Sequence, residues 1–216
     1  MKSVRILVAD DHEVVRRGVC SLLASQPGWT VVGEAVTGRD AVKKAEKLKP
    51  DVVILDISMP ELNGLEATRQ ILKAVPQAEV LILTIHDSEQ VARQVLSAGA
   101  RGYVLKSDAA RNLVTAIDTL CQHKPYFTSA VSEMVFRDFL KSSRSEEQSA
   151  ADRLTQRERE IVQLLAEGKS NKEVASILGI SVKTAETHRR NVLSKLNLHS
   201  ISDLIHYAIR NKIIEV

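Results

Sequence analysis

Five side chains suited to phosphoryl transfer follow short apolar runs of the sequence. They are Asp10 and Asp11 just after residues 4–8, Asp56 after residues 52–55, Thr84 after residues 80–83 and Lys106 after residues 102–105. Carboxylates brought together raise one another's pKa unless a cation compensates them, and Mg²⁺ is the hard divalent ion that oxygen ligands favour. Phosphoryl transfer requires such a metal ion, together with an ammonium group and a nucleophilic carboxylate.

The elements that would position these side chains alternate along residues 3–122. The four β-branched runs above, together with residues 30–34, predict five strands, and apolar residues spaced by three or four positions predict the helices between them. This alternation favours an α/β fold with a doubly wound five-stranded parallel sheet. Because ligands bind beyond the carboxyl ends of such strands, all five side chains are expected at one edge. Each alone would more simply be a solvated loop group or a helix cap, but their shared position favours a site.

The rest of the chain has a different pattern. Residues 123–150 contain most of the serine-rich stretch KSSRSEEQSAADR and predict a linker, with a short helix near residues 132–140. In residues 151–216, the capping-box patterns Thr155-x-x-Glu158 and Ser170-x-x-Glu173 predict two helix starts. Gly168 and Gly179 would end those helices, and two more are expected near residues 182–196 and 201–211. We therefore predict a first domain at 1–122 and a small all-α four-helix domain at 151–216.

The excess positive charge lies in the second domain. Residues 1–125 carry 16 basic and 15 acidic side chains, whereas residues 152–216 carry 11 and 8. The helix near residues 182–196 follows the tight turn Gly179-Ile180-Ser181 and bears four basic residues and a single acidic one. Such a helix can enter the DNA major groove while its basic side chains contact phosphates. The simpler alternative is an ordinary solvated face.

Composition argues against several other classes of protein. No run approaches the roughly eighteen apolar residues of a membrane-spanning helix, and no signal-peptide core is present, which predicts a cytoplasmic protein without membrane contacts. Cys20 and Cys121 lie in helix-like apolar patterns and are interpreted as reduced core thiols. The six His residues show no metal-ligand spacing.

Four segments of the first domain stand in a specific order and spacing: LVADD (7–11), DVVILDISMPELNG (51–64), LILT (81–84) and GYVLK (102–106). They resemble the receiver domain of two-component response regulators. The resemblance implies a flavodoxin-like fold in which Asp56 accepts a phosphoryl group from a sensor histidine kinase. It also implies that Asp11, Asp56 and the backbone carbonyl of Ser58 hold Mg²⁺ directly, with Asp10 acting largely through a water ligand.

The same resemblance implies how the receiver changes state. Lys106 would pair with the phosphoryl oxygens, the Thr84 hydroxyl would swing towards them, and Tyr103 would rotate inward as Thr84 moves away. Such a shift couples a local change of charge to the surface formed by the fourth helix, the fifth strand and the fifth helix.

Residues 154–200 resemble the LuxR-type helix-turn-helix domain over nearly its full length, so the whole chain resembles a NarL-type response regulator. In that family the helix near residues 182–196 reads DNA. At 100° per residue, Glu186, Thr187 and Arg190 share the face that would reach base edges. The candidate phosphate contacts are Asn171, Lys172, Lys183, Thr184, His188 and Lys195. The core would take Val192, Leu193 and Leu196.

The chain is therefore expected to be a phosphorylation-switched transcription factor rather than an enzyme, with Mg²⁺ as its cofactor. Its expected partners are a sensor histidine kinase, double-stranded promoter DNA and a second copy of the chain, with RNA polymerase as a further candidate. Dimerisation would double the short DNA site that one helix reads. The apolar residues Leu204, Ile205 and Ala208 would give either a dimer face or part of the bundle core.

Two other classes of protein are the alternatives. A phosphatase of the haloacid dehalogenase type also combines a nucleophilic Asp with Mg²⁺, Thr and Lys. It needs a second Asp two residues further on, where Ser58 stands in this sequence. A regulator that senses a small ligand would need an apolar or aromatic pocket in the first domain, and the sequence offers none.

Overall fold

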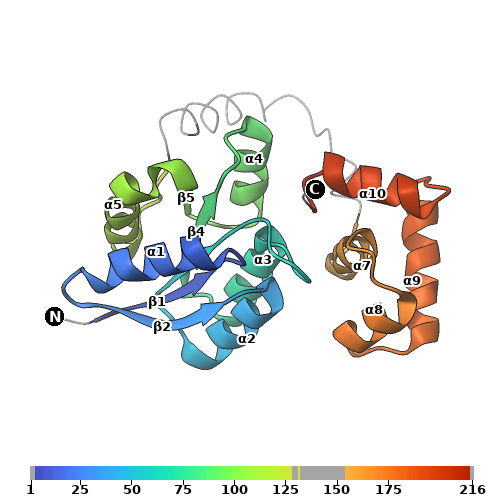
Figure 1. The fold of residues 1–216 in the computed structure, drawn as a ribbon, viewed down its shortest axis with the longest axis horizontal. Coiled ribbons are helices and arrows are strands. Elements are labelled where there is room, and N and C mark those ends of the chain that lie inside the picture. Colours follow the sequence, from blue (N-terminus) through green and yellow to red (C-terminus); the bar gives the residue numbers. More distant parts are fainter. Residues whose placement is uncertain (1–2, 128–130, 132–153, 215–216) are drawn as a thin grey trace. The chain divides into compact units, whose positions relative to one another are not determined.

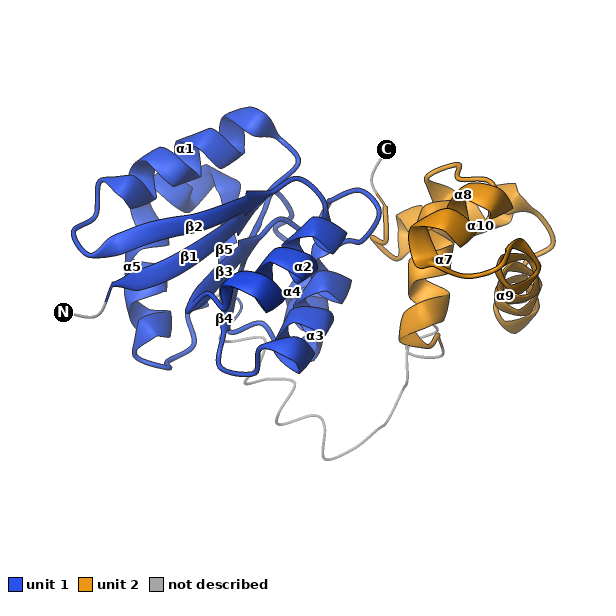
Figure 2. Ribbon diagram, turned by 90° about the horizontal axis from the view of Figure 1, so that it is seen from below, with its two compact units in different colours: residues 1–145 blue, residues 146–216 orange. Residues whose placement is uncertain are grey.

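The structure, a computed structural model, describes residues 3–127, 131 and 154–214, and the chain divides into two compact units, residues 1–145 and 146–216 (Figures 1 and 2). Five parallel strands form the sheet of the first unit in the order β2-β1-β3-β4-β5. They are β1 (Val4–Ala9), β2 (Trp29–Ala35), β3 (Val52–Leu55), β4 (Glu79–Thr84) and β5 (Gly102–Leu105). The predicted doubly wound sheet is confirmed, and each strand ends within one residue of its predicted bounds.

Five helices cover the two faces of this sheet. On one face lie α1 (Glu13–Ala24) and α5 (Ala109–Cys121), and on the other lie α2 (Gly38–Leu48), α3 (Gly64–Ala74) and α4 (Glu89–Ser97) (Figure 2). Successive residues of β1 point to opposite faces, so Ile6 and Val8 pack with α1 and α5 while Leu7 and Ala9 pack with α2 and α3. All four residues of β3 are buried, as expected for a strand covered on both sides.

The chain returns to the sheet after α5. Tyr126 forms a parallel bridge with Gly102, its amide donates to the carbonyl of Arg101 (2.8 Å), and its carbonyl accepts from the amide of Tyr103 (3.0 Å). Phe127 packs against the α2–α4 side and Tyr126 against the α1–α5 side. This short segment therefore covers part of the outer edge of β5, which the sequence patterns did not predict. The predicted linker helix near residues 132–140, like most of the predicted linker, lies outside the described residues.

The described part of the second unit, residues 154–214, contains four helices: α7 (Gln156–Ala166), α8 (Asn171–Leu178), α9 (Val182–Lys195) and α10 (Ile201–Arg210). Both predicted capping boxes are present, at Thr155 and at Ser170, because each N-cap hydroxyl accepts a backbone N–H while the glutamate three residues on accepts the N-cap amide. Gly179 ends α8 with φ +65° and Gly168 follows α7 with φ +81°, the left-handed conformation predicted for both. The helix starts and the turn of the predicted bundle are thus confirmed.

The burial of α10 decides whether its apolar residues form a dimer face or part of the bundle core. Leu204 and Ala208 are fully buried in the core of the second unit with Val192, so they complete the bundle and cannot also offer a dimer face. Ile205 packs beside them, half-buried.

Both cysteines are free, and Cys20 is half-buried against the α1–α5 core, but the interpretation of Cys121 as a core thiol is wrong. Cys121 is exposed although the preceding Leu120 is fully buried, because successive residues of a helix point about 100° apart.

A helix that crosses a bilayer needs about 20 predominantly apolar residues. None of the helices in residues 3–127 and 154–214 is long and apolar enough to cross a membrane.

Candidate functional site

An acidic cluster stands at the carboxyl ends of β1 and β3. Asp10, Asp11, His12 and Asp56 each offer one ligand atom, and these atoms lie within 4.8 Å of one another. Asp10 and Asp56 are almost fully buried, whereas Asp11 and His12 face solvent. The three carboxylates predicted from strand ends are therefore brought together.

His12 was missed by sequence reasoning, although it directly follows Asp11. Its Nδ1 lies 2.9 Å from Asp11 Oδ1 and 3.4 Å from Asp10 Oδ1, and its backbone amide donates to Asp10 Oδ1 (2.8 Å). Reading the histidines for mutual spacing alone overlooked a histidine whose partners are carboxylates next to it in the chain.

Lys106 joins the cluster from the other side. This first residue of the short 3₁₀ helix η1 (Lys106–Asp108) places its Nζ 2.9 Å from Asp10 Oδ2 and 2.9 Å from Asp56 Oδ2. Burial lowers the pKa of Lys106, but its hydrogen bonds and attraction to the two carboxylates outweigh burial and raise it. Burial and repulsion from Asp10 raise the pKa of Asp56 despite the opposing effect of Lys106. Burial therefore outweighs the stabilisation that Lys106 gives the ionised form of Asp56.

The backbone around Asp56 is held by close packing against α3. The Ile57 amide donates to Asp56 Oδ1 (2.8 Å), and the Gly64 amide donates to the Ile57 carbonyl (2.8 Å). A Cβ atom on Gly64 would lie 2.0 Å from the Asp56 carbonyl oxygen, so only glycine lets α3 start this close to the backbone of Asp56.

The donor set of this cluster fits a magnesium ion. Asp10, Asp11 and Asp56 with Lys106 carry a formal net charge of about −2 when ionised, which a divalent cation would balance. The ligands are hard carboxylate oxygens, and the Ser58 carbonyl belongs to the same loop as Asp56.

The two predicted switch residues meet at one backbone unit. The Thr84 hydroxyl oxygen accepts from the His86 amide (3.2 Å), and the Tyr103 hydroxyl donates to the His86 carbonyl. Both side chains are buried, so Tyr103 occupies an inward position. Burial, and then repulsion from Asp87, raise the pKa of Tyr103 to about 12, which keeps the phenol a hydrogen-bond donor at neutral pH. His86 therefore ties Thr84 to Tyr103, a link that sequence reasoning did not contain.

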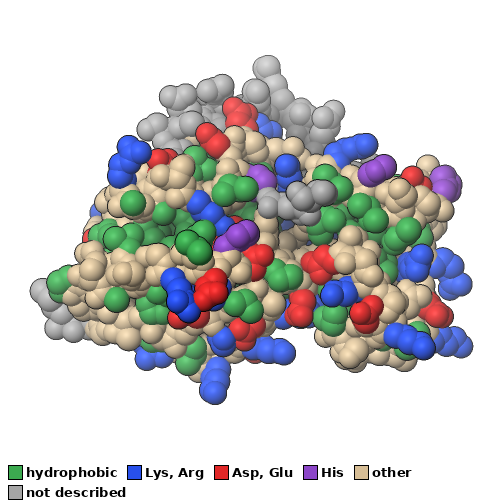
Figure 3. All heavy atoms as spheres, viewed as in Figure 1, with side chains coloured by type: hydrophobic (Ala, Val, Ile, Leu, Met, Phe, Trp, Pro, Cys, Tyr) green, Lys and Arg blue, Asp and Glu red, His purple; other side chains and the backbone are tan. Residues whose placement is uncertain are grey.

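In the second unit, basic side chains gather over α9, at the right of the view in Figure 3. A surface hollow of about 460 Å³ lies against this helix, and among the residues that line it are Asn171, Glu186, Arg189 and Arg190. Three of these were predicted DNA contacts, and the fold brings them together from α8 and α9. Arg189 is half-buried in the same hollow and was missed because it lies beside the projected base-reading face.

The other predicted DNA contacts differ in their exposure and in the hydrogen bonds that they make within the unit. Lys172 and Lys183 are exposed, His188 is half-buried, and the Thr184 hydroxyl pairs with that of the N-cap Ser181 (2.8 Å). The Thr187 hydroxyl donates to the Lys183 carbonyl (2.9 Å).

Lys195 already has a partner inside the unit, because its Nζ lies 2.8 Å from Glu158 Oε2. Although burial would raise the pKa of Glu158, its hydrogen bonds with Lys195 and Thr155 outweigh burial and lower it. Lys195 therefore connects α9 to the capping box of α7.

Models of two protein families match the chain. Residues 6–118 match the response regulator receiver domain, and residues 152–208 match the bacterial regulatory proteins of the luxR family.

Relatives align over nearly the whole chain. The oxygen regulatory protein NreC of Staphylococcus epidermidis is 38% identical over 98% of this chain and all of its own length. The transcriptional regulatory protein DegU of Brevibacillus brevis is 34% identical over 99% of this chain and 96% of its own. Among solved structures, the response regulator RcsB in complex with DNA is 26% identical, with a TM-score of 0.59 over 95% of this chain and 98% of that chain. A LuxR-family response regulator from Aurantimonas is 32% identical, with a TM-score of 0.60 over 64% of this chain and 99% of its own.

Proposed function

Since the chain belongs to the two-component response regulators of the NarL type, with a receiver domain followed by a LuxR-type DNA-binding domain, we propose that Asp56 is its phosphoacceptor. The observation that carries this proposal is the ammonium group of Lys106, which lies 2.9 Å from Asp56 and from Asp10 inside the acidic cluster. The proposed linker is residues 123–150, between domains at 1–122 and 151–216.

In the proposed reaction, a carboxylate oxygen of Asp56 attacks the phosphorus of a phosphohistidine on a sensor histidine kinase. The new O–P bond forms as the P–N bond breaks, and the electron pair of that bond stays on the imidazole of the kinase. Lys106 is close enough to donate hydrogen bonds to the phosphoryl oxygens when Asp56 becomes an acyl phosphate.

Magnesium is the proposed cofactor. Asp11, Asp56 and the backbone carbonyl of Ser58 would bind it directly, and Asp10 through water. When bound, the ion would neutralise charge on the transferring phosphoryl group. The fit of the donor set supports this, since buried Asp10 and Asp56 with Asp11 leave negative charge that Lys106 alone does not compensate.

The phosphoryl state would be read by Thr84 and Tyr103. If the Thr84 hydroxyl turns towards the phosphoryl group, it leaves the His86 amide that it now accepts from. Because Tyr103 donates to the carbonyl of the same residue, a shift of His86 would change the position of Tyr103 and the surface around α4 and β5.

In the second unit, α9 would be the helix that enters the major groove. Arg190 would donate to guanine, Glu186 would accept from cytosine, and the Thr187 methyl group would contact thymine. The hydrogen bond of the Thr187 hydroxyl to Lys183 supports the last role, because it leaves the methyl group as the unpaired part of the side chain. Phosphates would be contacted by Asn171, Lys172, Lys183, Thr184, His188 and Lys195.

We further propose a homodimer as the DNA-bound state and a cytoplasmic location, where promoter DNA is found. Relatives support the first of these, since one solved structure contains RcsB dimers bound to two parallel DNAs. RNA polymerase is a candidate partner at the promoter.

The receiver and DNA-binding domains of this family are not enzymes, and we propose that this chain has no turnover of its own. The phosphatase alternative requires an acid two residues after the nucleophile, where Ser58 stands. A single-turnover acceptor should instead take up one phosphoryl group and keep it until hydrolysis or transfer.

Intact-mass measurement after incubation with acetyl phosphate and Mg²⁺ tests the acceptor. We expect one acid-labile phosphoryl group per chain in the wild type and none in Asp56→Asn. Asp118→Asn, which changes an exposed carboxylate of α5, is the matched control and should be labelled like the wild type. Phosphate on Asp56→Asn would contradict the assignment, and continuous release of inorganic phosphate would favour the phosphatase.

A further inference from the structure

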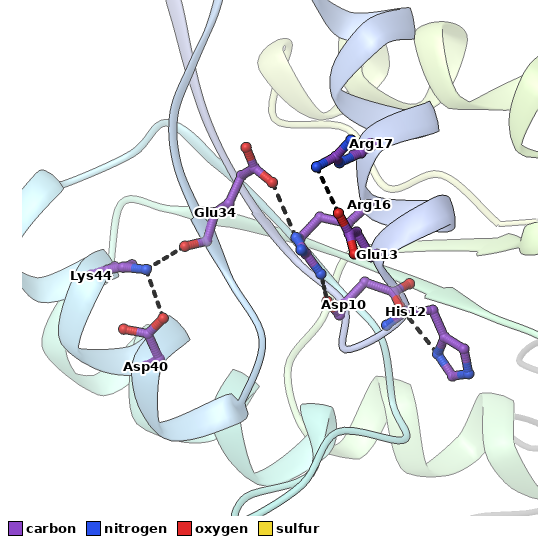
Figure 4. Close-up of polar contacts among 8 residues, drawn as sticks. All are labelled: Asp10, His12, Glu13, Arg16, Arg17, Glu34, Asp40 and Lys44. Atoms are coloured by element: carbon purple, nitrogen blue, oxygen red, sulfur yellow. Dashed lines mark hydrogen bonds and ion pairs between the residues drawn. The ribbon is translucent and has the colours of Figure 1, made fainter.

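Arg16 of α1 lies behind the acidic cluster and bonds to two different segments (Figure 4). Its Nη1 donates to the backbone carbonyl of Asp10 (2.8 Å), and its Nε donates to Glu34 Oε2 (3.0 Å) near the end of β2. Only 13% of its side chain is exposed. A guanidinium group can make two such bonds in fixed directions, which a lysine ammonium on a flexible stem does less well.

The next residue provides a contrast. Arg17 is 76% exposed and pairs with Glu13 (2.6 Å), one turn earlier in the same helix. Figure 4 shows that the two guanidinium groups point to different partners although the residues are adjacent. Only Arg16 of this pair reaches the loop that carries the carboxylates.

The partners of Arg16 are themselves fixed. Glu34 pairs with Val8 across the β1–β2 ladder, and its backbone carbonyl accepts from Lys44, which also pairs with Asp40 (2.6 Å). The Asp10 amide donates to the Ala35 carbonyl (3.2 Å). The backbone of Asp10 is therefore bonded on both sides, through N–H to β2 and through C=O to Arg16.

The Asp10 carbonyl belongs to the planar peptide that joins Asp10 to Asp11. Fixing this carbonyl fixes the orientation of that peptide, and with it the direction in which each carboxylate leaves the chain. In this orientation of the peptide both carboxylates meet Asp56, since all three contribute to one cluster.

We propose that Arg16 is a positioning residue for the magnesium site, holding the Asp10–Asp11 peptide so that both carboxylates face Asp56. The inference rests on the proposed magnesium-dependent function of this cluster. The change in Mg²⁺ affinity expected on replacing Arg16 is opposite in sign to the change that loss of its charge alone would cause. A positive group near a cation site opposes binding of the cation, so removing it for reasons of charge alone would tighten Mg²⁺, whereas removing a positioning bond would weaken it.

The test compares the full-length wild type, Arg16→Met, Arg16→Lys and the control Arg17→Met. Calorimetric titration with MgCl₂ gives the affinity directly, and the rate of phosphorylation by acetyl phosphate is measured as a function of Mg²⁺ concentration. We expect both Arg16 variants to bind Mg²⁺ about 10- to 100-fold more weakly, as for other groups that orient metal ligands. Their phosphorylation rates at saturating Mg²⁺ should approach that of the wild type, and Arg17→Met should match the wild type throughout.

Unchanged or tighter Mg²⁺ binding by Arg16→Met would overturn the proposal. If Arg16→Met does not fold, Arg16→Lys tests the proposal, because lysine keeps the positive charge but cannot make both hydrogen bonds of the guanidinium group in the same directions. Wild-type Mg²⁺ affinity in Arg16→Lys would then overturn the positioning role. Failure of the proposed function has a different signature, since the wild type itself would then not bind Mg²⁺ or would not be phosphorylated on Asp56.

Discussion

The two units hold the charged side chains of their proposed sites in opposite ways. In the first, Asp10 and Asp56 are almost fully buried and share Lys106, so the charges are partly compensated by one another. In the second, Glu186, Arg190 and Lys183 are exposed on α9 and remain solvated. Burial makes the first site costly to the fold and suited to a small ion and a phosphoryl group. Because its charges are exposed, the second site has little effect on the stability of the fold. It is suited to a large charged partner, which removes water from these charges on binding.

The largest expected effect separates two lysines, one from each unit. Lys106→Met leaves Asp10 and Asp56 buried without their cation and should lower the free energy of unfolding by about 3 kcal/mol in Mg²⁺-free buffer, because breaking a buried pair strands the remaining charge. Lys183→Met on α9 should change it by no more than about 0.5 kcal/mol. Urea unfolding measures both. Equal losses of unfolding free energy in the two variants would contradict the contrast between the two units.

A second effect concerns binding and not stability. Arg190→Ala should reduce discrimination at one base pair of the bound site by about 1–3 kcal/mol while leaving the unfolding midpoint unchanged. Fluorescence anisotropy with a preferred fragment and its single-base variants measures the discrimination. A uniform loss of affinity for all fragments would instead assign Arg190 to phosphates.

The pH dependence of stability should have opposite signs in the two units. Burial raises the pKa of Asp56, so its ionised form destabilises the fold above that pKa. Asp56→Asn should therefore unfold at higher urea concentration than the wild type at pH 7, and the difference should shrink as the pH falls towards about 4.

Asp203 at the start of α10 is the counterpart. Hydrogen bonds from the Ser200 side chain and the His199 backbone lower its pKa, so its ionised form stabilises the fold above its ordinary pKa and the gain is lost as the pH falls through the lowered value. Asp203→Asn should be less stable than the wild type at pH 7, with a difference that also shrinks in acid. Changes of stability of the same sign in Asp56→Asn and Asp203→Asn at pH 7 would contradict the opposite pH dependence of the two units.

The smallest effect distinguishes two basic residues of α9. Lys183→Ala should flatten the dependence of log Kd on log salt by about one unit, because an exposed lysine releases a counterion on meeting phosphate. Lys195→Ala should change this slope less, since Lys195 already neutralises Glu158. Equal changes in slope would mean that Lys195 leaves Glu158 when DNA binds.

The sequence predicts those parts of the site that depend on local rules. Asp10 and Asp56 directly follow β1 and β3, and Thr84 ends β4, so all three lie at strand ends that must meet at one edge. The capping residues Thr155 and Ser170 start helices by contacts within four residues. These positions follow from backbone geometry, so they could be placed without knowing any tertiary distance.

The features that were missed depend on distances between segments far apart in the chain. Arg16 reaches Glu34, Lys195 reaches Glu158, and Tyr126 returns to the edge of β5, yet each lies in a pattern that also fits a solvated surface or a linker. Periodicity gives the face of a helix but not the partner that this face meets. For Cys121 it gave the wrong exposure, because Cys121 points away from the core that buries its neighbour Leu120.

The central claim is that a phosphoryl group on Asp56 of the first unit changes DNA binding by the second. It is tested by anisotropy titration of one DNA fragment, enriched from genomic DNA with the phosphorylated protein. The titration is run on the wild type and Asp56→Asn, each with and without acetyl phosphate and Mg²⁺. We predict that phosphorylation tightens binding by the wild type and leaves Asp56→Asn unchanged. The same tightening in Asp56→Asn, or none in a wild type shown by mass to carry the phosphoryl group, would contradict the account.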